Sequence, residues 1–407
     1  MAEGEQEVTL RFRGTFSGAI QKSAAPTWVA GDQTAGVVGP KGSYLTRGFY
    51  APSSGLCTFR VRIRVPLPHR AVSQGRRTGE SENNGVHESV YESDHPRDGL
   101  VVVTGPWQMQ EREIAGLSCR TYLYEGDEAH AALLFSTLGE EVPRYQALFG
   151  GAVPDGRFDV VSNFFATGYG FPNFTLLGQT VIQYVCAKTA AAGQTVLPSG
   201  YLDHELVHCW LGNHLQVDYA KGNWCEALTT YFTNYGSALR GGSGGAHRAK
   251  VSRSFSLRVT PEKDYPLRAF HAKSHAFEND IGYGKGSMLF DMLARHLEGE
   301  RFLEAVRHVL ANHGGERLGW DELVAALSTG AGTDLKGWFE PWLSRTGGPT
   351  LEWGEVKYDG GRVAGTVRQT QEGEAYELRV RVRLHTSEGS SDHFVRSASK
   401  ESVFSLP

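Results

Sequence analysis

The hydrophobic period of this chain changes twice, and these changes constrain its architecture more than any other feature. Apolar residues alternate from about residue 8 to 124, follow a helical period from about residue 129, and alternate again beyond residue 348. A period of two is typical of strands and a period of 3.6 of helices. We therefore predict an α+β multidomain protein in which a central α/β domain lies between two β-domains.

A chain of 407 residues is too long for one ordinary core, so two or three domains are expected. We place an N-terminal β-rich domain at 1–125, a catalytic domain at 126–348 and a C-terminal β-domain, complete or not, at 349–407. Strands are expected over 8–13, 58–65, 100–103, 121–124, 157–162, 365–370 and 376–384. Helices are expected over 129–148, 176–192, 201–211, 225–239 and 284–342. An exposed loop is expected over 73–84, and an extended charged stretch after the glycine-rich turn at 241–245.

The composition is that of an ordinary globular protein. The 41 basic and 45 acidic residues are mixed evenly, with a net charge of -4, so neither nucleic acid nor an anionic membrane is expected as a partner. Five cysteines without paired spacing argue against a disulfide scaffold. There is no signal-peptide pattern and no transmembrane stretch, so we expect the chain as given to be soluble, whether whole or excised from a longer protein. The sequence indicates neither a compartment nor an oligomeric state.

The motif His204-Glu205-Leu206-Val207-His208 is the strongest chemical signal. Histidines at this spacing share one face of a helix and can reach one ion, although a polar surface pair has the same spacing. After seventeen intervening residues, Glu226 heads an amphipathic helix, where a carboxylate would be costly to bury unless it had a partner. We therefore predict one Zn²⁺ per chain, held by His204, His208 and Glu226.

Three protein ligands are typical of a catalytic zinc site, which keeps one position open for water. Zinc lowers the pKa of that water to about 7, and Glu205 is the candidate general base. Thr230, one turn beyond Glu226, is either a residue that orients a ligand or a surface threonine. Cys209 and Cys225 flank the ligands but are expected to be packing residues.

Three segments carry a resemblance to a known family. They are H-E-L-V-H-C-W-L-G-N, N-W-C-E-A-L-T-T-Y-F and G-Y-G-K-G-S-M-L-F, and they resemble the gluzincin metallopeptidases related to aminopeptidase N and leukotriene hydrolase. The resemblance covers residues 125–348 well. It implies a thermolysin-like catalytic domain between an N-terminal β-domain and a β-sandwich. It also implies that Tyr283 donates its hydroxyl to the tetrahedral intermediate.

The chain departs from that family at two points. The family has eighteen residues between the second histidine and the glutamate, one more than here, and we expect the shortening to fall in the connecting loop. Where the family aminopeptidases carry G-A-M-E-N, with a glutamate that binds the substrate amine, residues 168–174 contain no carboxylate. Gly168, Gly170 and Phe171 are the candidate substrate-binding residues of this segment, as an edge strand for a peptide or as a plain turn.

The sequence thus favours a zinc-dependent metallopeptidase that acts on a peptide or protein substrate. The missing carboxylate leaves open whether it is an aminopeptidase, an endopeptidase or a hydrolase of blocked substrates. A catalytically silent, zinc-binding relative that serves as a binding or scaffold module is the alternative. His214 is expected in a loop, and His271 and His275 are not expected to form a second metal site.

Overall fold

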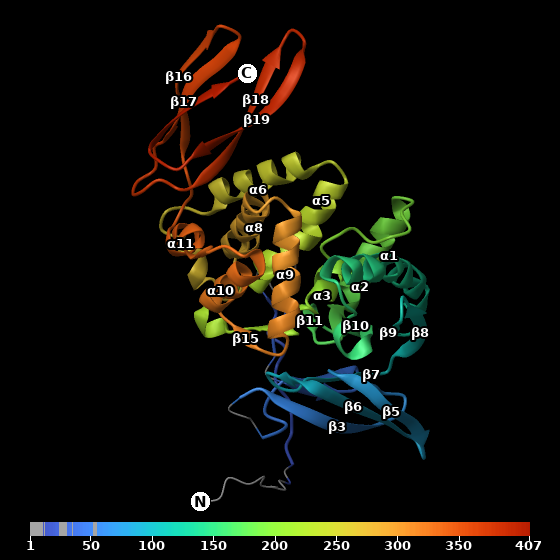
Figure 1. Ribbon diagram of the computed structural model, residues 1–407. Coiled ribbons are helices and arrows are strands. Elements are labelled where there is room, and N and C mark those ends of the chain that lie inside the picture. The colour runs from blue at the N-terminus through green and yellow to red at the C-terminus, as the bar shows by residue number, and fades with distance from the viewer. Residues whose placement is uncertain (1–10, 12, 24–30, 35, 52–54) are drawn as a thin grey trace, which may run out of the picture.

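The protein combines two β regions with a helical centre (Figure 1). The computed structural model describes residues 11, 13–23, 31–34, 36–51 and 55–407. Along these residues, β-sheets come first, a mixed α/β part follows, and β-sheets end the chain, which confirms the predicted α+β multidomain fold. The strand predicted over 8–13 lies largely outside the described residues.

The N-terminal part forms two sheets, drawn in blue in Figure 1. One has the order β1-β2-β7-β4 and consists of Val37–Gly39, Gly42–Leu45, Val102–Gly105 and Arg70–Ser73. The other has the order β3-β6-β5 and consists of Cys57–Pro66, Val86–Arg97 and Arg76–Asn83. The exposed loop predicted over 73–84 is wrong, because most of it is strand β5. Asn84 and Gly85, both with positive φ, make the turn from β5 to β6.

A five-stranded mixed sheet follows in the order β11-β12-β10-β9-β8. The strands are Gly168–Phe171, Phe174–Gly178, Arg157–Asn163, Leu117–Leu123 and Gln108–Ile114. Strand β10 runs parallel to both β9 and β12, and β10 and β12 are buried along their whole length. Strand β11 pairs antiparallel with β12 and forms an edge of the sheet. That edge faces the helix with the H-E-L-V-H motif.

A buried charge cluster joins the second N-terminal sheet to the five-stranded sheet. Asp159 of β10 is fully buried and forms ion pairs with Arg157 and with Arg77 of β5. Arg157 also donates a hydrogen bond of 2.6 Å to the carbonyl oxygen of Gly75. Buried carboxylates require such partners, so this cluster fixes one sheet against the other.

The helical part packs one large core. Its longer helices are α1 Ala131–Phe149, α2 Gln179–Ala191, α6 Gly244–Arg258, α8 Gly286–His296, α9 Glu300–His313, α10 Trp320–Ala331 and α11 Lys336–Ser344. Short helices are α3 Leu202–Val207, α4 Cys225–Thr230, α5 Gly236–Arg240 and α7 Ala276–Asn279, with the π-helices η4 Tyr231–Tyr235 and η6 Asp280–Lys285. A small sheet, β13-β14-β15, is formed by Leu211–Gly212, Leu215–Val217 and Arg317–Leu318. Trp338, Phe339 and Trp342 belong to this core.

Helix α6 corrects the extended charged stretch expected after residue 245. It is polar nearly all round, so its sequence lacks the apolar stripe that marks a core helix. Side-chain contacts hold it instead. Arg258 pairs with Asp280 of η6, and Arg248 donates a hydrogen bond of 2.6 Å to the hydroxyl of Tyr235.

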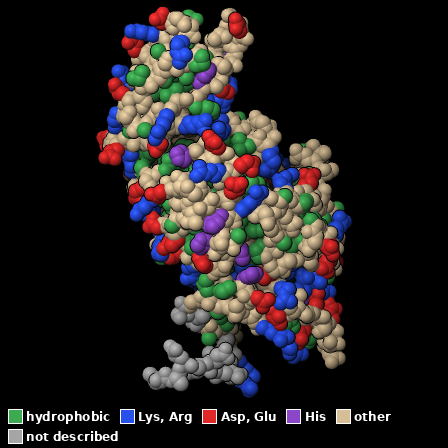
Figure 2. All heavy atoms as spheres, viewed as in Figure 1, with side chains coloured by type: hydrophobic (Ala, Val, Ile, Leu, Met, Phe, Trp, Pro, Cys, Tyr) green, Lys and Arg blue, Asp and Glu red, His purple; other side chains and the backbone are tan. Residues whose placement is uncertain are grey.

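The C-terminal part, at the top of Figure 1, forms two further sheets. One has the order β16-β17-β20 (Leu351–Asp359, Arg362–Gln369, Glu401–Leu406), and the other pairs β18 with β19 (Leu378–Thr386, Gly389–Ser397). A small apolar core that includes Val367, Val382, Val395 and Phe404 lies between them. Acidic and basic side chains are interspersed over the face shown in Figure 2. None of the helices among the described residues has the length and apolarity needed to cross a membrane.

Candidate metal centre

Helix α3 presents both histidines of the motif, but it is shorter than predicted. It spans Leu202–Val207 instead of 201–211. The backbone N–H groups of Cys209 and Trp210 bond to carbonyls three residues back, so the last turn tightens. Leu211 then enters β13, which pairs with β14. Because the chain must join this small sheet at Leu211, the α-helix ends at Val207. His204 and His208 are still one helical turn apart.

Glu226 lies in the first turn of α4, at the start of a second helical segment. This segment continues through the π-helix η4 into α5, Gly236–Arg240. Tyr283 lies in the second π-helix, η6. π-Helical turns are rare and occur frequently at functional sites, where they redirect side chains. Helix α4 packs against both α3 and η6, so three segments distant in sequence meet at one point.

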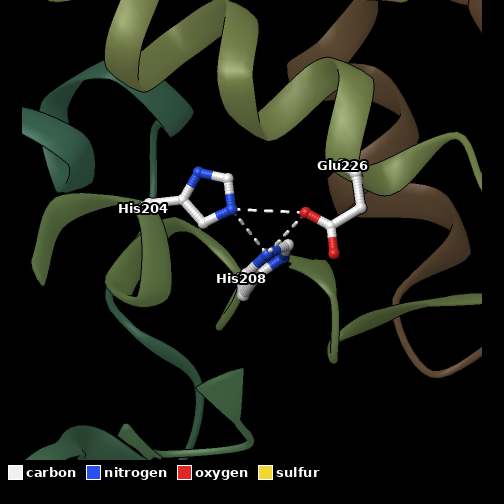
Figure 3. A group of neighbouring side chains, drawn as sticks. All are labelled: His204, His208 and Glu226. Carbon is white, nitrogen blue, oxygen red and sulfur yellow. Dashed lines mark hydrogen bonds and ion pairs between the residues drawn. The ribbon is translucent and has the colours of Figure 1, made fainter. Parts of the chain in front are cut away.

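Three side chains converge there, as Figure 3 shows. His204 Nε2 and His208 Nε2 are 3.2 Å apart, and Glu226 Oε2 lies 3.2 Å from the first and 3.4 Å from the second. They form the one group of three potential ligands found among the described residues, with ligand atoms within 4.8 Å of one another. No described lysine or arginine pairs with Glu226. Two imidazole nitrogens and a largely buried carboxylate suit a divalent cation such as Zn²⁺.

The charges at this centre also favour a cation. Burial by itself lowers the pKa of His208, but the carboxylate of Glu226 outweighs burial and holds that pKa well above its usual value. Burial raises the pKa of Glu226, yet His208 and His204 hold it well below its usual range. The carboxylate is therefore ionised, and positive charge between the three groups is strongly stabilised.

The outer nitrogens of the two imidazoles have partners of their own. His208 Nδ1 lies 2.9 Å from the carbonyl oxygen of Leu211, which places its proton there and leaves Nε2 free as a ligand. Thr229 Oγ1 is 3.4 Å from His208 Nδ1, and Thr233 Oγ1 is 3.5 Å from His204 Nδ1. Thr230 is buried, and its hydroxyl has no hydrogen-bond partner among the described residues. The threonines facing the histidines are thus the two on either side of Thr230.

Tyr283 lies beside the metal-binding group. Its ring stacks on that of His204 at a centroid distance of 6.2 Å, and the ring of Phe270 meets it edge-on at 6.0 Å. Burial raises the pKa of the Tyr283 hydroxyl well above its usual value, and the charges of Glu226 and Glu205 raise it further. The hydroxyl therefore stays protonated and can donate a hydrogen bond.

The edge strand β11 approaches this helix closely at Gly170. A Cβ atom built on Gly170 would lie 2.6 Å from Glu205 Oε2 and 3.3 Å from His208 Cβ, so a larger residue here would displace the Glu205 carboxylate. At Gly168, two residues earlier, a Cβ atom would meet no atom of the described residues within 4 Å. Sequence reasoning named both glycines as an edge strand or a turn. They lie in a strand, and its backbone passes directly over Glu205.

A small cavity of about 190 Å³ opens between β11, the N-terminal sheets and the turn after His208. From the central part of the chain it is lined by Phe171, Pro172, Asn213 and Tyr219, and from the N-terminal part by Gln74, Arg97 and Asp98 among others. Its walls are therefore both polar and aromatic. The N-terminal part contributes to the surroundings of the site, which periodicity and motif spacing could not reveal.

The remaining histidines near the motif lie apart from the metal-binding group. His214 lies between β13 and β14 against His95, with ring centroids 5.2 Å apart. Burial, together with the charges of His95 and Arg97, lowers the pKa of His214 to about 4. His271 Nδ1 lies 2.6 Å from the carbonyl oxygen of Tyr219, and His275 is the residue that precedes α7. Cys209 and Cys225 are buried free thiols.

Residues 160–342 match the Peptidase family M1 domain. This matched stretch contains the His/His/Glu group, and it is similar to the M1 peptidase domain. Over 241 residues, the chain is 22% identical to mitochondrial aminopeptidase 2 of Saccharomyces cerevisiae, a match that covers 57% of this chain and 25% of that protein. Over 251 residues it is 24% identical to the alanine/arginine aminopeptidase of the same yeast, with 58% and 29% covered.

A solved structure supports the same fold. The crystal structure of Legionella pneumophila aminopeptidase A in complex with aspartic acid matches with a TM-score of 0.65 and 17% identity, over 91% of this chain and 46% of that one. The matches to the two yeast aminopeptidases span about a quarter of their length. The chain is therefore similar to these aminopeptidases in part of its sequence and in its fold, and it spans a limited part of their length.

Proposed function

We propose that this protein is a zinc-dependent metallopeptidase that hydrolyses peptide bonds at the group formed by His204, His208 and Glu226. The observation that carries the proposal is the convergence of two imidazole nitrogens and one carboxylate oxygen within 3.4 Å of one another, with no competing lysine or arginine among the described residues. The match of residues 160–342 to the M1 domain supports it. One Zn²⁺ per chain is expected.

The residues around the zinc ligands supply the other parts of the reaction. Bound at the three ligands, zinc would polarise the scissile carbonyl and make water a strong nucleophile at neutral pH. Glu205 accepts the proton of the attacking water and returns it to the leaving amine. Tyr283 donates its hydroxyl hydrogen to the carbonyl oxygen as negative charge develops there. The raised pKa of Tyr283 supports this role, because the hydroxyl keeps its proton at neutral pH.

Strand β11 is the proposed platform for the substrate backbone. As an edge strand it has one row of backbone N–H and C=O groups that face away from β12, and an extended peptide can pair with them. Gly168, Gly170 and Phe171 are the candidate contacts, and Gly170 brings the peptide close to Glu205. Residues 168–174 contain no carboxylate to bind a free amino terminus. The proposal therefore leaves open whether the chain trims amino termini.

Glu205→Gln tests the assignment of the base. Glutamine has nearly the same shape but cannot accept the proton, so kcat/KM for a cleaved peptide should fall by about 10² to 10⁴-fold. Metal analysis by mass spectrometry should still find one zinc per chain, since Glu205 is not a ligand. Tyr283→Phe should lower kcat by about 10² to 10³-fold, again with zinc retained. A Glu205→Gln protein as active as the parent would refute the base assignment.

A catalytically silent relative is the second candidate, favoured by the missing amine-binding carboxylate. It would bind zinc through the same three ligands and serve as a binding or scaffold module. The two candidates differ in one outcome. Only the peptidase yields cleavage products that disappear in Glu205→Gln.

A further inference from the structure

We propose that Lys273 is a specificity-determining residue that binds a carboxylate of the substrate beside the scissile bond. The inference rests on the proposed peptidase function and adds a substrate class to it. The carboxylate is either an acidic side chain next to the cleaved bond or the α-carboxylate of a short peptide. Sequence motifs gave no sign of this residue.

The position of Lys273 carries the inference. Its ammonium nitrogen lies 4.2 Å from the centre of the Tyr283 ring. That ring in turn stacks on His204, with centroids 6.2 Å apart and planes inclined by 17°. Lys273 and the proposed zinc ligand His204 therefore lie against the same aromatic ring, which carries the hydroxyl of the proposed oxyanion donor. A substrate held between Tyr283 and Glu205 would come within reach of this side chain.

Lys273 has no anionic partner in the part of the chain that the structure describes. No described carboxylate forms an ion pair with it, and its contact with Tyr283 is a cation–π interaction. The acidic residue nearest in sequence, Glu278, is occupied, because it accepts hydrogen bonds of 2.5 and 2.7 Å from the backbone N–H groups of Ser274 and His275. Lys273 is thus a partly buried cation that lies beside the proposed substrate site and is not paired with a described carboxylate. It can therefore pair with an anion on the substrate.

The other charges around the site also favour an anionic group on the substrate near Lys273. The carboxylates whose charges act on Tyr283 are Glu226 and Glu205, and both have roles in the proposed reaction. The facing segment, residues 168–174, carries no carboxylate. Lys273 is thus the charge next to Tyr283 that catalysis does not use. It attracts a substrate carboxylate and repels a substrate ammonium group, whereas a carboxylate on the facing segment would have done the reverse.

The closing experiment compares matched peptide pairs in which Glu is replaced by Gln on one side of the cleaved bond or the other. A second pair compares a short peptide as free acid and as C-terminal amide. The parent should favour the acidic member of one pair by about tenfold in kcat/KM, which corresponds to about 1.4 kcal/mol. The pair that shows the preference identifies the source of the carboxylate. Lys273→Gln should bring that ratio close to one, and Lys273→Glu should reverse it.

Lys263→Gln is the matched control. Lys263 also lies over an aromatic ring, but that ring belongs to Phe277, at 5.9 Å, and not to Tyr283. Lys263→Gln should have the same ratio of kcat/KM for the acidic and the neutral peptide as the parent. A parent ratio near one for every pair, or a Lys273→Gln ratio equal to the parent's, would overturn the assignment. The second result would show that Lys273 serves only to pack against Tyr283.

Binding measured without turnover separates this inference from the proposed function. Two zinc-loaded proteins, Glu205→Gln and the double variant Glu205→Gln with Lys273→Gln, are titrated with the same peptide pairs by calorimetry. Tighter binding of the acidic member that depends on Lys273 supports the assignment even if the parent cleaves nothing. Equal dissociation constants for both members overturn it, whether or not the parent is a peptidase.

Discussion

Gly170→Ala is the sharpest test of how β11 and Glu205 are arranged. The added methyl group would lie 2.6 Å from Glu205 Oε2, and an ordinary contact needs about 1 Å more. Because Oε2 is the end of a flexible side chain, Glu205 can turn away at a cost of about 1 kcal/mol. Reduced backbone freedom of the unfolded chain offsets part of that cost. We expect the free energy of unfolding to change by about 1 kcal/mol or less.

Catalysis should suffer far more than stability. A displacement of about 1 Å at a catalytic group can lower a rate by about 10²-fold. We therefore expect kcat/KM for a cleaved peptide to fall by about 10²-fold in Gly170→Ala, with one zinc per chain retained, because His208 makes only a looser contact at 3.3 Å. Steady-state kinetics, metal analysis and thermal unfolding of the same preparation separate these effects.

Gly168→Ala is the matched control on the same strand. A methyl group there meets nothing within 4 Å, and the backbone groups of β11 are kept. Its loss of activity should be far smaller than that of Gly170→Ala. Equal losses in the two variants would mean that strand stiffness, and not contact with Glu205, limits activity. Unchanged kinetics in Gly170→Ala would refute the placement of Glu205 as the base beneath β11.

Two further predictions concern stability. Asp159→Asn leaves Arg157 and Arg77 without their shared buried carboxylate and should lower the free energy of unfolding by about 3 to 5 kcal/mol in urea titrations, whereas Asp94→Asn, at an exposed pair, should cost under about 1 kcal/mol. His214, with a folded pKa of about 4, favours the folded state above its unfolded pKa of about 6.5 and loses this contribution as pH falls towards 4. The loss should reach about 3 kcal/mol, and His214→Gln should be less sensitive to pH over this range. Equal slopes in both proteins would refute the burial of neutral His214.

Periodicity predicted the order of the β and α/β parts because buried strands and helices repeat their apolar residues at different intervals. Periodicity did not predict elements that are mostly exposed, because burial does not determine where their apolar residues fall. Strand β5 is mostly exposed and is held by cross-strand ion pairs such as Arg76 with Glu92, so its polar sequence is typical of a loop. Helix α6 is likewise polar, and its fold depends on contacts such as Arg258 with Asp280.

The candidate site shows the same division between local and distant causes. His204, Glu205 and His208 are set by one helical turn, so their spacing is visible in the sequence. Gly170 approaches Glu205 through packing of two segments that are more than thirty residues apart in sequence. Lys273 approaches Tyr283 because the chain before α7 folds back against η6. Likewise, Thr229 and Thr233, and not Thr230, face the imidazoles. A one-residue rotation on a helix cannot be decided before the packing is known.

Cleavage of a diverse peptide library, with the product ends mapped by mass spectrometry, tests the central claim most directly. The zinc-loaded parent should cut internal or terminal peptide bonds, and the products should be lost in Glu205→Gln although its zinc content is the same. The positions of the cuts will show whether the chain trims amino termini. A parent that holds one zinc and cuts no peptide in the library would contradict the account.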